Sequence, residues 1–143
     1  MIAIDTDVLA IYFIYIWDKR YSIAKRIIED LIKNKATTII NVLELSGLMA
    51  LAQDGGKAKD IFRLIHERLD FNILYWKHWP TLQQYISKTM DYISRGLSLG
   101  DAQISWICEE NNVSLFLTWN KRHFEGKVKF EVLTPDEYID QFG

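Results

Sequence analysis

The segment Ile2-Ala3-Ile4-Asp5-Thr6-Asp7 is the most informative about the fold, because it joins a short apolar run to acidic residues at the expected start of a helix. We expect a strand at residues 2–4 and a helix from Thr6 or Asp7 to about Trp17. A second continuous apolar run, Leu115-Phe116-Leu117-Thr118, also leads into a polar turn. Continuous apolar strands that alternate with helices are typical of a parallel sheet with both faces covered.

The rest of the chain continues this alternation. Further strands are expected at residues 37–40, 71–75 and 130–133, the last of them a short edge strand. Further helices are expected over Ser22–Asn34, from a cap at Asn41 to Ala52, after Asp54-Gly55-Gly56, from Pro80 to Arg95, from Ser98 to about Asn112, and from Thr134 onward. With no repeat or linker between them, these elements predict one domain over residues 1–143. It should be a three-layer α/β/α sandwich with a mostly parallel sheet of four to five strands.

Composition narrows the class of protein. With 49% hydrophobic and 25% charged residues the chain is not a disordered one. The lone cysteine, Cys108, excludes an internal disulfide and favours a reducing, cytoplasmic setting. A net charge of −2 argues against binding nucleic acid by bulk charge, though not against an enzyme whose metal ions supply positive charge. No targeting segment or membrane span is expected, because the apolar run Val8–Trp17 is about half the length that crosses a bilayer.

Acidic residues follow or precede several of the expected strands, where parallel sheets bind their ligands. Asp5 and Asp7 follow the first strand, Glu44 follows the second, and Asp101 begins the helix that leads to the fourth. Glu44 and Asp101 lie beside apolar stripes, where a carboxylate is costly unless a cation or a hydrogen-bond donor meets it. Converging carboxylates without a basic partner suit Mg²⁺ or Mn²⁺.

Helix capping is a simpler explanation for each of these residues taken alone. The patterns Asn41-x-x-Glu44 and Ser98-x-x-Asp101 both match a capping box, and Asp5 and Asn120 are common N-cap residue types. The two roles are compatible, because a helix amide that keeps a carboxylate ionised also prepares it for a metal ion.

Four motifs taken in order resemble the PIN-domain family, and in particular the VapC-type toxins of bacterial and archaeal toxin–antitoxin pairs. They are Ile-Asp5-Thr6-Asp7-Val-Leu, Asn41-Val-Leu-Glu44-Leu, Leu-Ser-Leu-Gly-Asp101-Ala and Leu-Thr118-Trp119-Asn120-Lys-Arg-His123-Phe. The resemblance implies a metal-dependent ribonuclease that uses Mg²⁺ or Mn²⁺ and works with a cognate antitoxin. It implies that Asp5, Glu44 and Asp101 hold the metal and, with Asn120, form the catalytic set. Asn120 departs from the family, since it is neutral where the family's fourth acidic residue lies.

Roles for the neighbouring residues follow from this resemblance. Asp7 would partly compensate for the missing charge, and the hydroxyls of Thr6 and Thr118 would hold a phosphate oxygen or a water molecule. Lys121, Arg122 and His123 would contact phosphates of the RNA substrate. The expected reaction is endonucleolytic hydrolysis of a phosphodiester.

Two partners and two alternative functions complete the expectations. The run Val8–Trp17 is apolar on every side, which predicts a homodimer and, together with Ser22–Asn34, a surface for the antitoxin. The first alternative is a HAD-like phosphatase with Asp5 as nucleophile and Asp7 as acid–base residue. The second is a non-catalytic PIN-like binding module that lacks an acid at Asn120.

Overall fold

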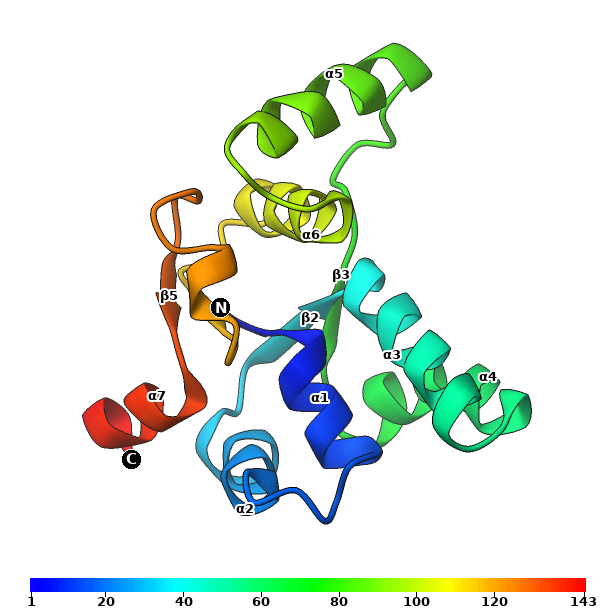
Figure 1. The fold of residues 1–143 in the computed structure, drawn as a ribbon, viewed down its shortest axis with the longest axis vertical. Helices are drawn as coiled ribbons and strands as arrows, with labels where there is room; N and C mark the ends of the chain where they lie inside the picture. Colours follow the sequence, from blue (N-terminus) through cyan, green and yellow to red (C-terminus); the bar gives the residue numbers. More distant parts are fainter.

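The computed structural model describes residues 1–143 and shows a five-stranded sheet between two layers of helices (Figure 1). The strand order is β3-β2-β1-β4-β5, and every neighbouring pair is parallel. The strands are β1 (Ile2–Ile4), β2 (Lys35–Thr38), β3 (Asn72–Leu74), β4 (Leu115–Leu117) and β5 (Glu131–Leu133). The predicted α/β/α sandwich with a parallel sheet is confirmed, and β5 lies at an edge as expected.

Helices cover both faces of this sheet. They are α1 (Thr6–Phe13), α2 (Tyr21–Lys25), α3 (Ile39–Ala52), α4 (Gly55–Arg63), α5 (Leu82–Ser94), α6 (Leu99–Glu110) and α7 (Pro135–Phe142). Two π-helical turns, η1 (Arg26–Leu31) and η2 (Leu64–Arg68), extend α2 and α4, and a 3₁₀ turn, η3 (Lys121–His123), follows β4. No helix combines the length and the apolar character needed to cross a membrane.

The core consists of two apolar clusters, one on each face of the sheet. Along β4, Leu115 and Leu117 belong to the cluster under α1, η1 and α3, whereas Phe116 belongs to the cluster under α5 and α6. This alternation follows from the two-residue period of a strand. Both faces of the central strands are therefore buried, which explains why their sequences are apolar without interruption.

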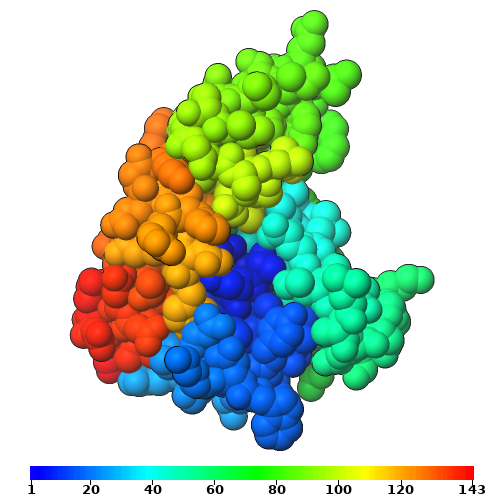
Figure 2. All heavy atoms as spheres, in the orientation of Figure 1, coloured from blue at the N-terminus to red at the C-terminus, as the bar shows by residue number.

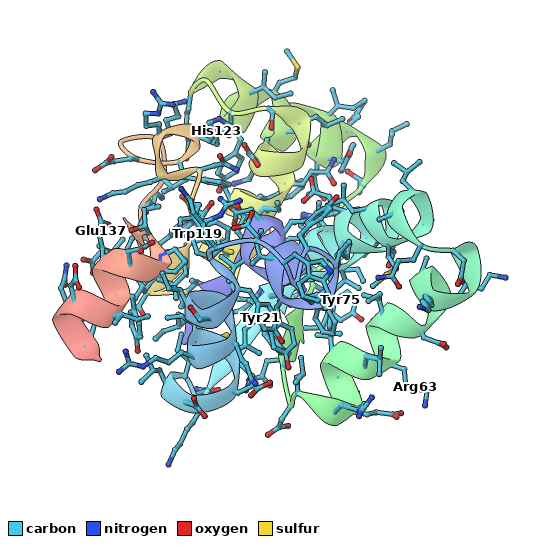
Figure 3. The ribbon with its side chains drawn as sticks, turned by 60° about the horizontal axis from the view of Figure 1, so that its bottom comes forward. Tyr21, Arg63, Tyr75, Trp119, His123 and Glu137 are labelled. Carbon is cyan, nitrogen blue, oxygen red and sulfur yellow. The ribbon has the colours of Figure 1, made fainter.

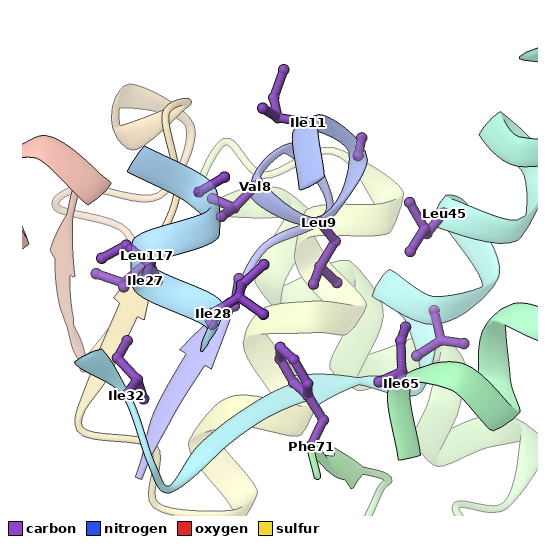
Figure 4. Packing of buried hydrophobic residues seen from close by; sticks show 14 of the residues in the cluster. Val8, Leu9, Ile11, Ile27, Ile28, Ile32, Leu45, Ile65, Phe71 and Leu117 are labelled. Atoms are coloured by element: carbon purple, nitrogen blue, oxygen red, sulfur yellow. The ribbon is translucent and has the colours of Figure 1, made fainter. Parts of the chain in front are cut away.

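The helix after β1 is shorter than predicted, and its role differs. It ends at Phe13 rather than near Trp17. Val8–Ile11 lie inside this chain's own core, where Val8 and Leu9 pack among residues of η1 and α3 (Figure 4). The first half of this apolar run is therefore covered within the chain, and the predicted contact with another chain is left to its exposed end. Residues 15–17 form an exposed turn after the helix, and Trp17 is 94% exposed.

The boundary between β2 and α3 also differs from the prediction. The strand was expected at residues 37–40 and the cap at Asn41, but the strand ends at Thr38 and the helix begins at Ile39. The Thr38 hydroxyl accepts a hydrogen bond from the backbone amide of Asn41, and the Thr38 backbone amide donates one to Oδ1 of the Asn41 side chain. This capping box ends the strand two residues early, despite the β-branched pair Ile39-Ile40.

Candidate functional site

The site lies between β1 and β4, where the order in which the chain adds strands to the sheet reverses its direction. From β1 the chain moves outward through β2 and β3, and then crosses to β4 and β5 on the other side of β1. The carboxyl ends of β1 and β4 are adjacent, with Ile4 opposite Leu117 in the register. Parallel sheets bind ligands at such a switch point. Residues that follow β1 and β4 are thereby brought together although they are more than a hundred positions apart.

Asp5 follows β1 directly and is held by three donors. Its Oδ1 accepts hydrogen bonds from the Thr6 amide at 2.8 Å and from Asn41 Nδ2 at 2.9 Å. Its Oδ2 accepts one from the Thr118 hydroxyl at 2.7 Å. Asp5 is thus the N-cap of α1, as the capping interpretation predicted, and is also fixed from β4 and α3. Its buried carboxylate has one orientation only.

Asp7 reaches from α1 to the segment after β4. Its Oδ2 accepts hydrogen bonds from the amides of Trp119 and Asn120, at 2.9 and 3.2 Å. Its Oδ1 is buried and has no hydrogen-bond partner. A carboxylate oxygen buried without a donor is costly, so this atom fits a site that a cation completes.

Glu44 projects from α3 and is oriented by Thr6. The Thr6 hydroxyl donates to Glu44 Oε1 at 2.6 Å and accepts from Asn41 Nδ2 at 2.9 Å. Because a hydroxyl has one hydrogen, this bond to Glu44 uses the donor of Thr6. Asn41, not Glu44, makes the capping bonds of α3, so the predicted capping box Asn41-x-x-Glu44 was wrong. The carboxylate of Glu44 takes no part in capping α3 and is held by Thr6 instead.

Asp101 lies in the first turn of α6. The Ser98 side chain caps the helix by accepting from the Asp101 amide at 3.3 Å, which confirms half of the predicted capping box. Asp101 Oδ2 lies 3.7 Å from His123 Nδ1, and the His123 side chain is 62% exposed. The Asp101 carboxylate therefore approaches the segment after β4 while it stays at the start of its own helix.

The segment after β4, in which Trp119 and His123 are labelled in Figure 3, also contributes Asn120 and the basic turn η3. Asn120 precedes η3 and makes no side-chain cap, contrary to the capping interpretation. Lys121 is already bound by Glu137, at 3.1 and 3.2 Å, and by Glu125 at 3.7 Å. Arg122 is exposed and forms no ion pair, in contrast to Lys121.

These elements enclose an open pocket of about 510 Å³. Its lining is Asp5, Thr6, Asp7, Glu44, Gly47, Leu48, Leu51, Asp101 and Asn120. Figure 2 shows the start of α1 at the surface in the middle of this face, framed by α3, α6 and the segment after β4. All four predicted acidic residues and Asn120 meet here, and no lysine or arginine lines the pocket.

Burial raises the pKa of every carboxyl group in the pocket, and repulsion by neighbouring carboxylates adds to the effect at Asp5 and Glu44. The pKa of Asp5 rises well above its usual value, chiefly through burial and then through the charges of Asp7 and Asp101. Burial raises the pKa of Asp7 against the lowering effect of the Trp119 amide. Burial also raises the pKa values of Glu44 and Asp101, and the charge of Asp101 adds to the effect on Glu44.

The residues fit a hard divalent cation by their chemistry. Four carboxylates and one carboxamide supply only oxygen donors, which Mg²⁺ and Mn²⁺ prefer. The repulsion among the carboxylates and the unpartnered Asp7 Oδ1 are both relieved by positive charge. In this arrangement no three acidic, histidine or cysteine side chains form a ready-made ligand group, so the side chains would have to adjust around an ion.

Sequence reasoning missed Asn41 as a site residue. It is fully buried and joins three elements of the site, because its amide group donates to both Asp5 and Thr6 while its oxygen accepts from Thr38. One signal for this role was present in the sequence. Asn41 is a polar residue inside the apolar run from Ile39 to Val42, where a residue that only caps a helix at the surface is not expected.

Comparison with known proteins identifies the family. The family model described as the PIN domain matches residues 2–128. No curated protein sequence matches the chain significantly. Among the solved structures that are similar in fold are the following three, each at 20% sequence identity or less.

The first is VapBC-1 from nontypeable Haemophilus influenzae, with a TM-score of 0.64, 19% identity, and coverage of 95% of this chain and 99% of that one. The second is Mycobacterium tuberculosis VapC20, described as a toxin that cleaves the sarcin–ricin loop, with a TM-score of 0.62, 15% identity, and coverage of 88% and 91%. The third is a toxin–antitoxin complex from Klebsiella pneumoniae, with a TM-score of 0.62, 20% identity, and coverage of 94% and 98%. With the family model spanning nearly the whole fold and its acidic pocket, the chain belongs to the PIN-domain family.

Proposed function

We propose that the chain is a ribonuclease that requires Mg²⁺ or Mn²⁺ and acts as the toxin of a toxin–antitoxin pair. The pocket of four carboxylates at the switch point of the sheet carries this proposal. Family membership supports it, as does the likeness to VapC20, a toxin that cleaves the sarcin–ricin loop. Asp5, Glu44 and Asp101 would hold the ion, with Asp7 close enough to contribute charge.

When bound there, the ion would polarise a phosphodiester and lower the pKa of the attacking water. The chain's own residues orient the site. Thr118, the Thr6 amide and Asn41 fix the carboxylate of Asp5, and the Thr6 hydroxyl fixes that of Glu44. Both threonine hydroxyls donate to carboxylates, so we propose that they position the carboxylate ligands and do not hold a phosphate oxygen or a water molecule. Asn120 offers a neutral carboxamide that could position the attacking water.

RNA would enter along the rim formed by the segment after β4. We propose that Lys121, Arg122 and His123 contact its phosphates, with unequal contributions. Arg122 is exposed and free of ion pairs, and His123 lies beside Asp101. Lys121 is already neutralised by Glu137 and Glu125, so its contribution should be the smallest.

We propose two protein partners, in the cytoplasm where RNA is available. Likeness to toxin–antitoxin complexes supports an antitoxin, and the exposed turn after α1 with Trp17 is the proposed contact.

The second proposed partner is another copy of the chain, and the surface of α5 supports such a homodimer better than α1 does. Leu82, Ile86 and Met90 repeat every fourth residue there and are 74%, 52% and 58% exposed.

An uncharged apolar row of this kind can pack against itself across a two-fold axis. Light scattering of the purified protein should give the mass of a dimer, and Ile86→Glu should give that of a monomer. A monomeric wild-type protein at micromolar concentration would contradict the dimer.

The two alternatives have less support. A phosphatase mechanism needs Asp7 as a mobile acid–base residue, yet Asp7 is bound by two backbone amides, and Glu44 would have no role. A non-catalytic module would not need a pocket of four carboxylates, two of which, Asp5 and Glu44, are oriented by Thr6, Asn41 and Thr118.

Cleavage of RNA by the purified protein tests the proposal. We expect cleavage with Mg²⁺ or Mn²⁺, none with a chelator, and a loss of several orders of magnitude in Glu44→Gln. Asp60→Asn, which removes an exposed carboxylate on α4, is the matched control and should cleave like wild type. Undiminished cleavage in chelator would refute the metal mechanism, and no cleavage under any condition would favour the binding module.

A further inference from the structure

Gly100 lies in the first turn of α6, one residue before Asp101, and the carboxylate of Glu44 lies against it. A Cβ atom built on Gly100 would come within 2.8 Å of Glu44 Oε2. Contacts of a Cβ shorter than 3.0 Å are essentially never seen. Any other residue at this position would therefore displace the Glu44 carboxylate.

Backbone conformation does not explain the glycine. The glycines with a positive φ are Gly96 and Gly126, so Gly100 has a conformation that other residues adopt readily. Glycine is also a poor residue inside a helix, where alanine is more stable by up to about 1 kcal/mol. What the position requires is space, and the neighbour that needs the space is Glu44.

Glu44 is held on its other side by α1. Its Oε1 accepts the hydrogen bond from the Thr6 hydroxyl at 2.6 Å, and Thr6 is in turn held by Asn41. The carboxylate is thus confined between Thr6 on α1 and Gly100 on α6. Because Gly100 adjoins Asp101, this position also keeps two negative charges near each other, an arrangement that a bound cation favours.

We propose that Gly100 is a positioning residue for the metal site: the missing side chain lets the Glu44 carboxylate lie against α6, bonded to Thr6 and beside Asp101. The expected effect of Gly100 on metal affinity rests on the proposed function. Its structural part, the position of Glu44, stands independently of metal.

The chain contains a matched control in Gly47. This residue is also helical and lines the same pocket, one turn after Glu44 on α3, but a Cβ built on it meets nothing within 4 Å. Gly100→Ala and Gly47→Ala both add one methyl group to a helix at the pocket. Only the first methyl meets Glu44.

The experiment compares the two variants by crystal structure without metal, by metal-free melting temperature, and by calorimetric titration with Mn²⁺. We expect both variants to melt at or above the wild-type temperature. In Gly100→Ala, Glu44 should have moved out of hydrogen-bond distance of Thr6, and the dissociation constant for Mn²⁺ should rise about 10-fold or more, as for other losses of ligand positioning. Gly47→Ala should retain both properties of the wild type.

The same Mn²⁺ titration in a Glu44→Gln background shows whether Gly100→Ala weakens Mn²⁺ binding through Glu44 or through Asp101. If Gly100 acts through Glu44, adding Gly100→Ala to Glu44→Gln should not weaken Mn²⁺ binding further. An equal loss in that background would assign the effect to Asp101 and overturn the inference, as would a Glu44 carboxylate that has not moved in Gly100→Ala. A displaced Glu44 in a protein whose wild type binds no Mn²⁺ would uphold the positioning role and refute the proposed function instead.

Discussion

Replacing Asp101 by asparagine distinguishes a metal ligand from an acid that only stabilises its helix. Without metal, the change removes the favourable charge at the start of α6, worth about 0.3–1 kcal/mol, and the exposed pair with His123, worth at most about 1 kcal/mol. It also removes repulsion, because the charge of Asp101 raises the pKa values of Asp5 and Glu44. Since these effects oppose one another, we expect the metal-free variant to lie within about 1 kcal/mol of wild type.

The larger difference should appear when metal is added. At a Mn²⁺ concentration 100 times the wild-type dissociation constant, binding stabilises the folded state by about 2.7 kcal/mol. If losing Asp101 weakens binding about 100-fold, the same concentration stabilises the variant by only about 0.4 kcal/mol. For a domain of this size, 1 kcal/mol corresponds to a shift of roughly 3 °C, so the melting temperature should rise by about 8 °C in wild type and about 1 °C in Asp101→Asn.

Thermal melts with and without Mn²⁺ measure this directly. Glu137→Gln is the matched control, because Glu137 occupies the same helical position in α7 and forms a full capping box outside the pocket. Its response to Mn²⁺ should equal that of wild type. An Asp101→Asn variant that still gains 8 °C and still cleaves RNA would refute Asp101 as a metal ligand.

The carboxyl groups of the pocket, the Thr118 hydroxyl and the basic turn after β4 can each be tested by one substitution. Folding raises the pKa values of the pocket's carboxyl groups, so they stabilise the folded state fully below the ordinary carboxyl pKa of about 4, and this stabilisation is lost as the pH rises through the raised values. The free energy of unfolding of the metal-free wild type should therefore fall more steeply with rising pH than that of Asp101→Asn. Equal slopes for the two proteins would contradict the repulsion. Thr118→Val removes a buried donor to Asp5 and should cost about 1–3 kcal/mol in denaturant unfolding at neutral pH, whereas no cost would show that this hydrogen bond is unimportant. Arg122→Ala should raise the KM for RNA severalfold at low salt, while Lys121→Ala should change it less; the reverse order would show that the ion pairs of Lys121 open for RNA.

Much of the fold was predictable because it depends on local patterns. Uninterrupted apolar strands and amphipathic helices identified the parallel sandwich, and Gly96, with its positive φ, ended α5 where expected. Errors arose where local signals competed. Ile39 and Ile40 favour a strand by their side chains, yet the Thr38 capping box begins the helix before them. The length of α1 and the burial of Val8–Ile11 depend on packing against η1 and α3, which no local pattern reveals.

The composition of the site was predictable, but its internal organisation was not. Asp5, Glu44 and Asp101 could be found because acids at the ends of strands and beside apolar stripes are conspicuous in a sequence. The connections through Asn41, Thr6 and Thr118 join residues 35 to 113 positions apart, and only the folded chain brings them together. The engagement of Lys121 by Glu137 is hidden for the same reason.

The central claim, that the acidic pocket holds a divalent cation, is tested most directly by anomalous diffraction from crystals grown with Mn²⁺. The account predicts an anomalous peak within coordination distance of carboxylate oxygens of Asp5, Glu44 and Asp101, with no comparable peak in Asp101→Asn crystals. A pocket without a peak at a Mn²⁺ concentration that supports RNA cleavage, or a peak bound elsewhere on the chain, would contradict it.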